Sequence, residues 1–378
     1  MGGHVLEHSR LAGLPPFVAR IALAVLALLL TASALVPVGR PAGSEGSVEA
    51  RQAADAVAAD YDEDIALYKV AIERIRQGES YYDFIVSEQR ARRYPVNPGL
   101  AVRLPTLAYI DAWLGSFGQM AAAIALMLGV IAAWWRKFRE DPALGRLSAR
   151  ATAMVAVAAA LGLNRHFFPL HELWAGMLIA LSFGLHRIGT RDHGGRWIGA
   201  FLAAALALAI REHTLPFVLL MAATALYYRN WREGAAWLAL VVLFLAGLAW
   251  HLAIVAQDVL PSDPHSAPWL VLRGLPGWLA NVVQSSNLRW LPHWLAGPAV
   301  VLMTFGWLGW NSRAGTFGFL LSAGYGAAFM LAGRWDNFYW GAMIAPAMFA
   351  GIVFAPRALG ALVEAARLAG GARLTAVK

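Results

Sequence analysis

The chain alternates between long apolar stretches and short segments that carry arginines. Apolar residues make up 59% of its 378 residues and charged residues only 14%, whereas roughly a quarter of the residues of a soluble domain are charged. A helix that spans a bilayer needs about 20 mostly apolar residues, and about ten such stretches can be found. The sequence therefore predicts an all-α polytopic membrane protein with about 10 transmembrane helices.

The predicted spans form a single transmembrane domain over residues 1–356, and a cytoplasmic tail follows at 357–378. The spans are predicted at residues 17–36, 107–135, 151–168, 172–187, 197–212, 214–228, 234–256, 294–311, 315–333 and 340–356. The first could be a signal peptide that is cleaved near Thr31–Ala34, but an uncleaved helix fits better because many further spans follow. Glycines inside the spans are interpreted as helix-packing positions.

Two long polar segments interrupt the spans, at residues 38–105 and 257–293. In the first, Val48–Gln77 is rich in helix formers but too polar to span, which predicts amphipathic helices at the membrane surface. The second contains several tryptophans, which favour the membrane–water interface. These are Trp269, Trp278 and Trp290.

Short basic segments predict the orientation of the chain in the membrane. Five of them would lie on one side, at Arg136–Arg150, Arg187–Arg196, Arg229–Arg232, Arg313 and Arg357–Lys378. Because Lys and Arg are retained in cytoplasmic loops, both termini are predicted to be cytoplasmic and both long polar segments periplasmic. The same pattern explains the net charge of +8 without a nucleic-acid partner. The Ala-, Gly- and Arg-rich composition is compatible with a bacterial inner (cytoplasmic) membrane.

An acidic run in the first polar segment is the sharpest local feature. It holds Asp60, Asp62, Glu63 and Asp64. Such a run can simply begin a solvated helix, since acidic side chains favour the positive end of the helix dipole. It can also supply a general base, which must be held within hydrogen-bond reach of the proton that it removes.

Three arginines on separate segments are predicted to lie on the same outer side: Arg103, Arg211 and Arg334. Interfacial arginines often only extend toward lipid headgroups. Together, however, these three favour an anion site, because the planar guanidinium matches the oxygens of a phosphate. The expected anion at a membrane surface is a lipid-linked phosphate.

Histidines near these arginines could suggest a metal. His166, His171 and His213 lie near Glu172 and Glu212, but they lack the one-turn spacing of H-E-x-x-H. A hydrogen bond to substrate or a structural role is therefore favoured, and no metal or other cofactor is predicted. The chain has no cysteine, no phosphate-binding loop and no nucleophile elbow, which argues against thiol chemistry, nucleotide hydrolysis and serine hydrolysis.

The first polar segment resembles that of the GT-C glycosyltransferases, which include aminoarabinose transferases, protein O-mannosyltransferases and polyprenyl-phosphomannose-dependent mannosyltransferases. The resemblance lies in Glu63-Asp64 with Tyr68, in the later Tyr81-Tyr82, in Tyr94-Pro95, and in Arg103-Leu104-Pro105, where the family usually has two prolines after the arginine. Weaker resemblance continues in Arg211-Glu212 and in Arg334–Tyr339 followed by Pro346.

The resemblance implies an inverting glycosyltransferase with a periplasmic active site. The donor would be a polyprenyl-phosphate-linked sugar in the membrane lipids, and the acceptor a hydroxyl of a glycan, a lipid or a protein. Asp64 would be the base, with Asp62 and Glu63 as alternatives, and the three arginines would hold the phosphate. The other residues expected around the substrate are Glu212, His213, His171, Glu172, Tyr94 and Asp336.

Two other hypotheses stay open. A membrane transporter or lipid flippase could line its pathway with the same charges, but it should show internal repeats and polar residues within its spans. The middle of the spans is mainly Ala, Leu, Val and Gly, which favours an enzyme at the membrane surface. A scaffold without chemistry would not need the outward charges.

Overall fold

A computed structural model of the protein describes residues 10–38, 64–189 and 197–367. These residues are mostly helical, and no β-strand occurs among them. The first described part of the long polar segment is a helix over residues 64–76. The α-helices that follow or precede it are α1 (Pro16–Leu35), α3 (Tyr81–Ala91), α4 (Thr106–Arg139), α5 (Leu147–Ala159), α6 (His171–Leu185), α7 (Ile198–Ile210), α8 (Leu215–Tyr227), α9 (Trp231–Asp258), α10 (Gly274–Gln284), α11 (His293–Gly306), α12 (Arg313–Leu331), α13 (Ala345–Met348) and α14 (Gly351–Arg367). Two short 3₁₀ helices, η5 (Glu212–Thr214) and η8 (Trp335–Met343), contribute residues to the cavity.

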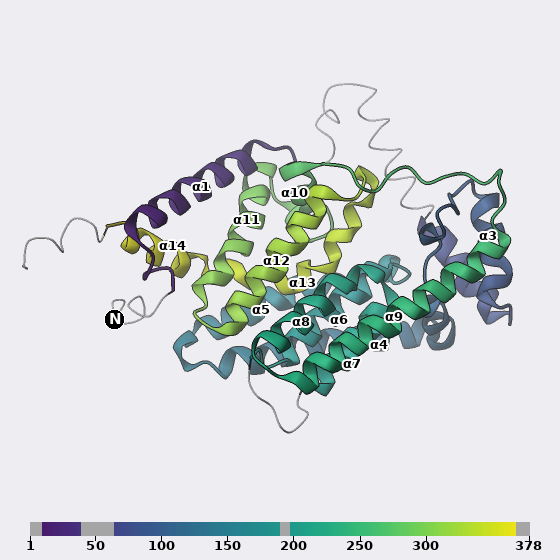
Figure 1. Cartoon of the computed structure of the whole chain (residues 1–378), viewed down its shortest axis with the longest axis horizontal. Coiled ribbons are helices and arrows are strands. Elements are labelled where there is room, and N and C mark those ends of the chain that lie inside the picture. The colour runs from purple at the N-terminus through teal and green to yellow at the C-terminus, as the bar shows by residue number, and fades with distance from the viewer. Residues whose placement is uncertain (1–9, 39–63, 190–196, 368–378) are drawn as a thin grey trace, which may run out of the picture.

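Four of the described helical stretches are long and apolar enough to cross a membrane. They are Pro16–Leu35, Gly99–Arg139, Trp231–Asp258 and Arg313–Leu331. Shorter apolar helices, such as α6 and α7, pack between them (Figure 1). The protein is therefore a helical protein with membrane-spanning character, as its composition predicts.

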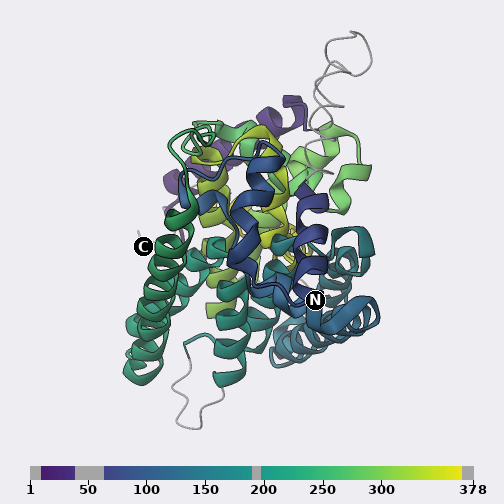
Figure 2. The same cartoon turned by 90° about the vertical axis from the view of Figure 1, so that its right-hand side faces the viewer.

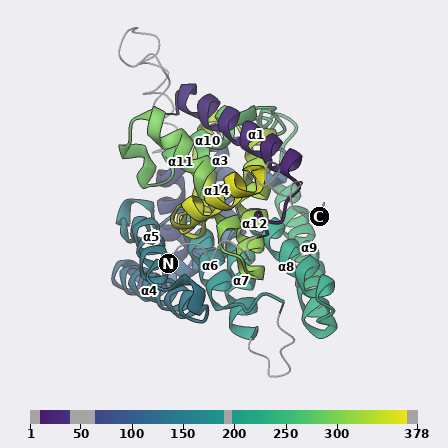
Figure 3. The ribbon, with the colours of Figure 1, turned by 90° about the vertical axis from the view of Figure 1, so that its left-hand side faces the viewer.

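The last predicted span, at residues 340–356, is not one helix. The structure divides this stretch into η8, α13 and α14, and α14 continues to Arg367 in the predicted tail. Pro346 lies in the first turn of α13, where a missing N–H costs nothing. Helix α14 then crosses α1 and α11 (Figure 3), with Leu362 packed near Ala19.

The second long polar segment also differs from its prediction, because α10 enters the bundle. It packs between α12 and η8, and Trp278 is only 7% exposed, so this tryptophan does not lie at a surface. Trp290 does, being 78% exposed. Leu279, Val282 and Val283 account for the difference, because they are buried and give α10 an apolar face.

Glycines allow the closest helix contacts, as the sequence predicts. A Cβ atom on Gly306 of α11 would overlap the carbonyl of Gly351 in α14, and one on Gly176 of α6 would overlap the carbonyl of Ala342 in η8. Small residues of this kind let helices approach closely where no hydrophobic effect drives them together. These contacts hold η8, and with it the site described below, against the bundle.

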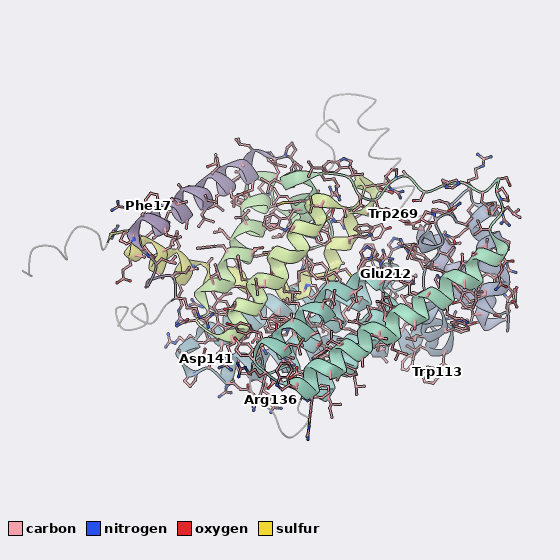
Figure 4. The ribbon with its side chains drawn as sticks, in the orientation of Figure 1. Phe17, Trp113, Arg136, Asp141, Glu212 and Trp269 are labelled. Atoms are coloured by element: carbon pink, nitrogen blue, oxygen red, sulfur yellow. The ribbon has the colours of Figure 1, made fainter. Side chains whose placement is uncertain are left out.

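The described parts of the predicted basic segments lie at one end of the molecule. Arg187 pairs with Glu140 at 2.6 Å, Arg357 donates to the carbonyl of Ala143 at 3.1 Å, and Arg313 donates to the carbonyl of Gly189. Figure 4 shows Arg136 and Asp141 toward this end and Glu212 and Trp269 toward the other. The grouping of segments that the charge pattern predicts thus appears in the tertiary structure.

Candidate active site

A cavity of about 880 Å³ lies at the end of the bundle opposite the basic segments. Its walls come from the helix at 64–76, residues 89–103, η5, residues 264–269, α12 and η8. Figure 2 shows the helices of the first polar segment, in blue, in front of the bundle at this end. The cavity thus brings together parts of both long polar segments and the ends of several apolar helices.

One carboxylate and one guanidinium meet in this cavity across a tyrosine hydroxyl. The Tyr339 hydroxyl donates to Oδ2 of Asp64 at 3.3 Å, and Nη2 of Arg103 donates to the Tyr339 oxygen at 3.5 Å. Nε of Arg103 donates to the Tyr68 hydroxyl at 3.1 Å. Burial raises the pKa of Tyr68 to about 12, so its phenol stays neutral. Asp64 and Arg103 are therefore held near each other by neutral hydroxyls.

Local structure explains how these groups reach one spot. Asp64 and Tyr68 are four residues apart on one helix, so they share a face. The backbone of Arg103 is fixed by the Tyr81 hydroxyl, which donates to its carbonyl at 2.8 Å. In η8, Asp336 and Tyr339 lie on either side of a break in the helix at Asn337, and both line the cavity.

A clasp between the two long polar segments borders the cavity. Nε of Arg90 in α3 pairs with Oδ1 of Asp263 at 2.5 Å, and the Ser266 N–H donates to the carbonyl of Asn97 at 2.7 Å. The hydrogen bonds from Arg90 and from the Leu260 N–H lower the pKa of the Asp263 carboxyl to about 2. Asp263 is thus ionised in the neutral range, and the clasp stays charged.

Arg211 has a different position from the one predicted. It is fully buried and lies behind the cavity, where it pairs with Glu172 at 2.7 Å and with Glu212 at 2.7 Å. The Glu212 carboxylate also lies 3.3 Å from Nδ1 of His213. Arg211 is therefore a counter-ion for two carboxylates rather than a group that faces the cavity.

The structure places the other predicted site residues in two groups. Tyr94, Glu212, His213, Arg334 and Asp336 line the cavity with Asp64 and Arg103. His171 and Glu172 do not; His171 is buried against the Tyr68 ring, with centroids 5.0 Å apart. Asp60, Asp62 and Glu63 lie outside the described residues. Arg334 pairs with Asp336 at 2.9 Å, which occupies one edge of its guanidinium.

Sequence reasoning missed two parts of the site. The first is the bridging hydroxyl of Tyr339, for which the spacing from Asp336 was the available signal. The second is the pair Arg92 and Arg93, which also line the cavity. Arg93 has a left-handed backbone, with φ of 61°, a conformation that no local pattern announces. Among the described residues, no group of three His, Asp or Glu side chains could hold a metal ion.

No family model, no curated protein and no solved structure matches this chain. Its function is therefore argued from the chemistry of the cavity.

Proposed function

We propose that this protein is an inverting membrane glycosyltransferase that transfers a sugar from a polyprenyl-phosphate donor to an acceptor hydroxyl. The observation that carries the proposal is the placement of Asp64 and Arg103 on either side of the Tyr339 hydroxyl, in a cavity of about 880 Å³. Such a volume lies within the range of pockets that hold drug-sized ligands. A sugar with its phosphate is well within that size.

The carboxylate of Asp64 and the guanidinium of Arg103 suit the two parts of the reaction, which are activation of the acceptor and departure of the phosphate. The acceptor oxygen forms a bond to the anomeric carbon while the bond from that carbon to the phosphate oxygen breaks. Asp64 takes the proton of the acceptor hydroxyl, as a positioned general base does. Arg103 stabilises the charge that develops on the leaving phosphate. Attack from the face opposite to the phosphate inverts the anomeric configuration.

Arg103 suits the phosphate role better than the other predicted arginines. Within the described part of the chain it forms no ion pair with a carboxylate, and its hydrogen bonds go to neutral hydroxyls. Arg211 and Arg334 each have a carboxylate partner. We therefore assign the phosphate first to Arg103 and treat Arg334 as a secondary contact at the wall.

The membrane setting completes the proposal. The positive-inside pattern and the position of the basic segments at the opposite end support a cavity on the periplasmic side of a bacterial inner membrane. There a lipid-linked donor is available and a nucleotide-sugar is not. The arrangement of spans would then be of the GT-C kind, with about 10 transmembrane helices.

The test is transfer by purified protein from a panel of polyprenyl-phosphate sugars, measured as the release of polyprenyl phosphate. Asp64→Asn should abolish release while the protein still folds, and Asp83→Asn, which changes an exposed carboxylate of α3, should not. Wild-type turnover by Asp64→Asn would contradict the assignment of Asp64 as the general base. Translocation of intact donor by the wild type, without release, would support the transporter hypothesis instead.

A further inference from the structure

A second guanidinium lies buried beside the cavity wall. Arg273 directly precedes α10 and is only 6% exposed. Its Nη2 donates to Oδ1 of Asn281 at 2.9 Å. Its Nε and Nη1 have no hydrogen-bond partner, and within the described part of the chain it forms no ion pair. Asp336 acts on this charge only from beyond ion-pair distance, so Arg273 lacks the close carboxylates that Arg211 has, and a buried charge without a close partner is costly.

Further unpartnered donors lie close to this guanidinium. Nδ2 of Asn281 and Nε1 of Trp340 are buried and, among the described residues, have no acceptor. Trp340 and Arg273 meet over Gly333: a Cβ atom there would lie 3.0 Å from the Trp340 ring and 3.1 Å from Nη1 of Arg273. The start and the middle of α10 thus leave several N–H groups of Arg273 and Asn281 without an acceptor among the described residues, and the Trp340 ring borders the guanidinium across Gly333.

The site is next to the cavity rather than deep in the bundle. Ala332 and Arg334, on either side of Gly333, both line the cavity, as does Trp340. Gly333 has a φ of 95°, which favours glycine, and it packs directly against Nη1 of Arg273. The Trp335 ring covers one face of the guanidinium at 4.7 Å and is itself 57% exposed.

The missing partner must be an anion with several acceptor oxygens. A phosphate group meets this requirement, because its oxygens can accept from a guanidinium edge and from neighbouring N–H groups together. The residues just before Arg273 indicate how the phosphate is carried. Leu270 and Leu272 are 84% and 80% exposed. At the end of a membrane bundle, such exposed apolar side chains are expected to face lipid chains.

We propose that Arg273 and Asn281, beside the Trp340 ring, form a binding site for the phosphate group of a membrane lipid, separate from Arg103, with the lipid chains over Leu270 and Leu272. The site does not depend on the proposed transferase activity. Its lipid is either the polyprenyl phosphate itself or a phospholipid of the bilayer, and the phosphate chemistry is the same for both.

Binding to the full-length protein in detergent tests the site without requiring catalysis. The probes are dioctanoyl phosphatidylglycerol, geranylgeranyl phosphate, inorganic phosphate and the neutral lipid dioctanoylglycerol. We expect one or both lipid phosphates to bind more tightly than the other two. Arg273→Gln should weaken that binding about tenfold, the loss typical of a hydrogen bond to a charged group. Arg289→Gln, in the same polar segment but stacked on Trp290, is the matched control and should bind as the wild type does.

Comparison of the probes identifies the lipid. Preference for geranylgeranyl phosphate supports a polyprenyl phosphate, and equal binding of both lipid phosphates supports a general phospholipid site. If Arg273→Gln does not fold, Arg273→Lys keeps the positive charge, removes the guanidinium edge and should still weaken binding severalfold. The proposal is overturned if dioctanoylglycerol or inorganic phosphate binds as tightly as the lipid phosphates, or if the variants bind as tightly as the wild type. A loss of binding in Arg103→Gln with none in Arg273→Gln would also overturn it.

Discussion

The hydroxyl of Tyr339 donates a hydrogen bond of 3.3 Å to the carboxylate of Asp64, 275 residues earlier in the chain. This contact joins η8 to the first polar segment inside the cavity. It helps to orient the carboxylate of Asp64 toward η8. A base of this kind is effective only when its oxygen is held toward the proton that it removes.

Removal of this hydroxyl should slow transfer without unfolding the protein. We expect Tyr339→Phe to lower kcat about tenfold, because a hydrogen bond to a charged group is lost while the ring remains. The KM for the donor should change little. The measurement is a steady-state comparison with Tyr227→Phe, a tyrosine that is 80% exposed at the other end of the molecule. Equal kcat values in the two variants would contradict the positioning role.

The arginines of the cavity should differ in their effect on donor binding. Arg103→Gln is expected to weaken donor binding about tenfold, because its guanidinium has no carboxylate partner among the described residues. Arg334→Gln should weaken it less, because Arg334 already pairs with Asp336. Donor dissociation constants of both variants, measured in detergent, check the order. A larger loss of donor affinity in Arg334→Gln than in Arg103→Gln would indicate that the phosphate binds mainly at Arg334, next to η8.

Arg211 should matter for stability more than for binding. Arg211→Ala leaves two carboxylates, Glu172 and Glu212, without their buried counter-ion. Loss of one partner from a buried ion pair costs about 3–5 kcal/mol. The half-exposed pair of Arg334 and Asp336 should contribute about 1 kcal/mol or less. Thermal unfolding in detergent should therefore show a much lower Tm for Arg211→Ala than for Arg334→Ala; similar values would refute this assignment.

The orientation in the membrane can be tested with single cysteines, because the chain has none of its own. A cysteine in place of the exposed Asp83 should react with a membrane-impermeant maleimide on intact spheroplasts. One in place of the exposed Arg146, at the basic end, should react only after lysis. The reverse result would place the cavity on the cytoplasmic side and remove the argument for a lipid-linked donor.

The sequence alone predicted the helical membrane class, the grouping of the short basic segments and the first polar segment as a source of site residues. These features depend on local composition, which hydropathy and charge measure directly. Helix α1 begins and ends within one residue of its predicted span for that reason. Asp64 and Arg103 were predicted from local pattern and resemblance, and both line the cavity.

Only the tertiary structure decided which charges are neutralised. Arg103 and Arg211 look alike in sequence, yet Arg211 is enclosed with Glu172 and Glu212, whereas Arg103 meets neutral hydroxyls. The entry of α10 into the bundle, the Tyr339 bridge and the burial of Arg273 could not be predicted from local sequence either. An ion pair or an orphaned donor depends on what lies within a few ångströms in space. That neighbourhood is set by helix packing between residues that the chain keeps far apart.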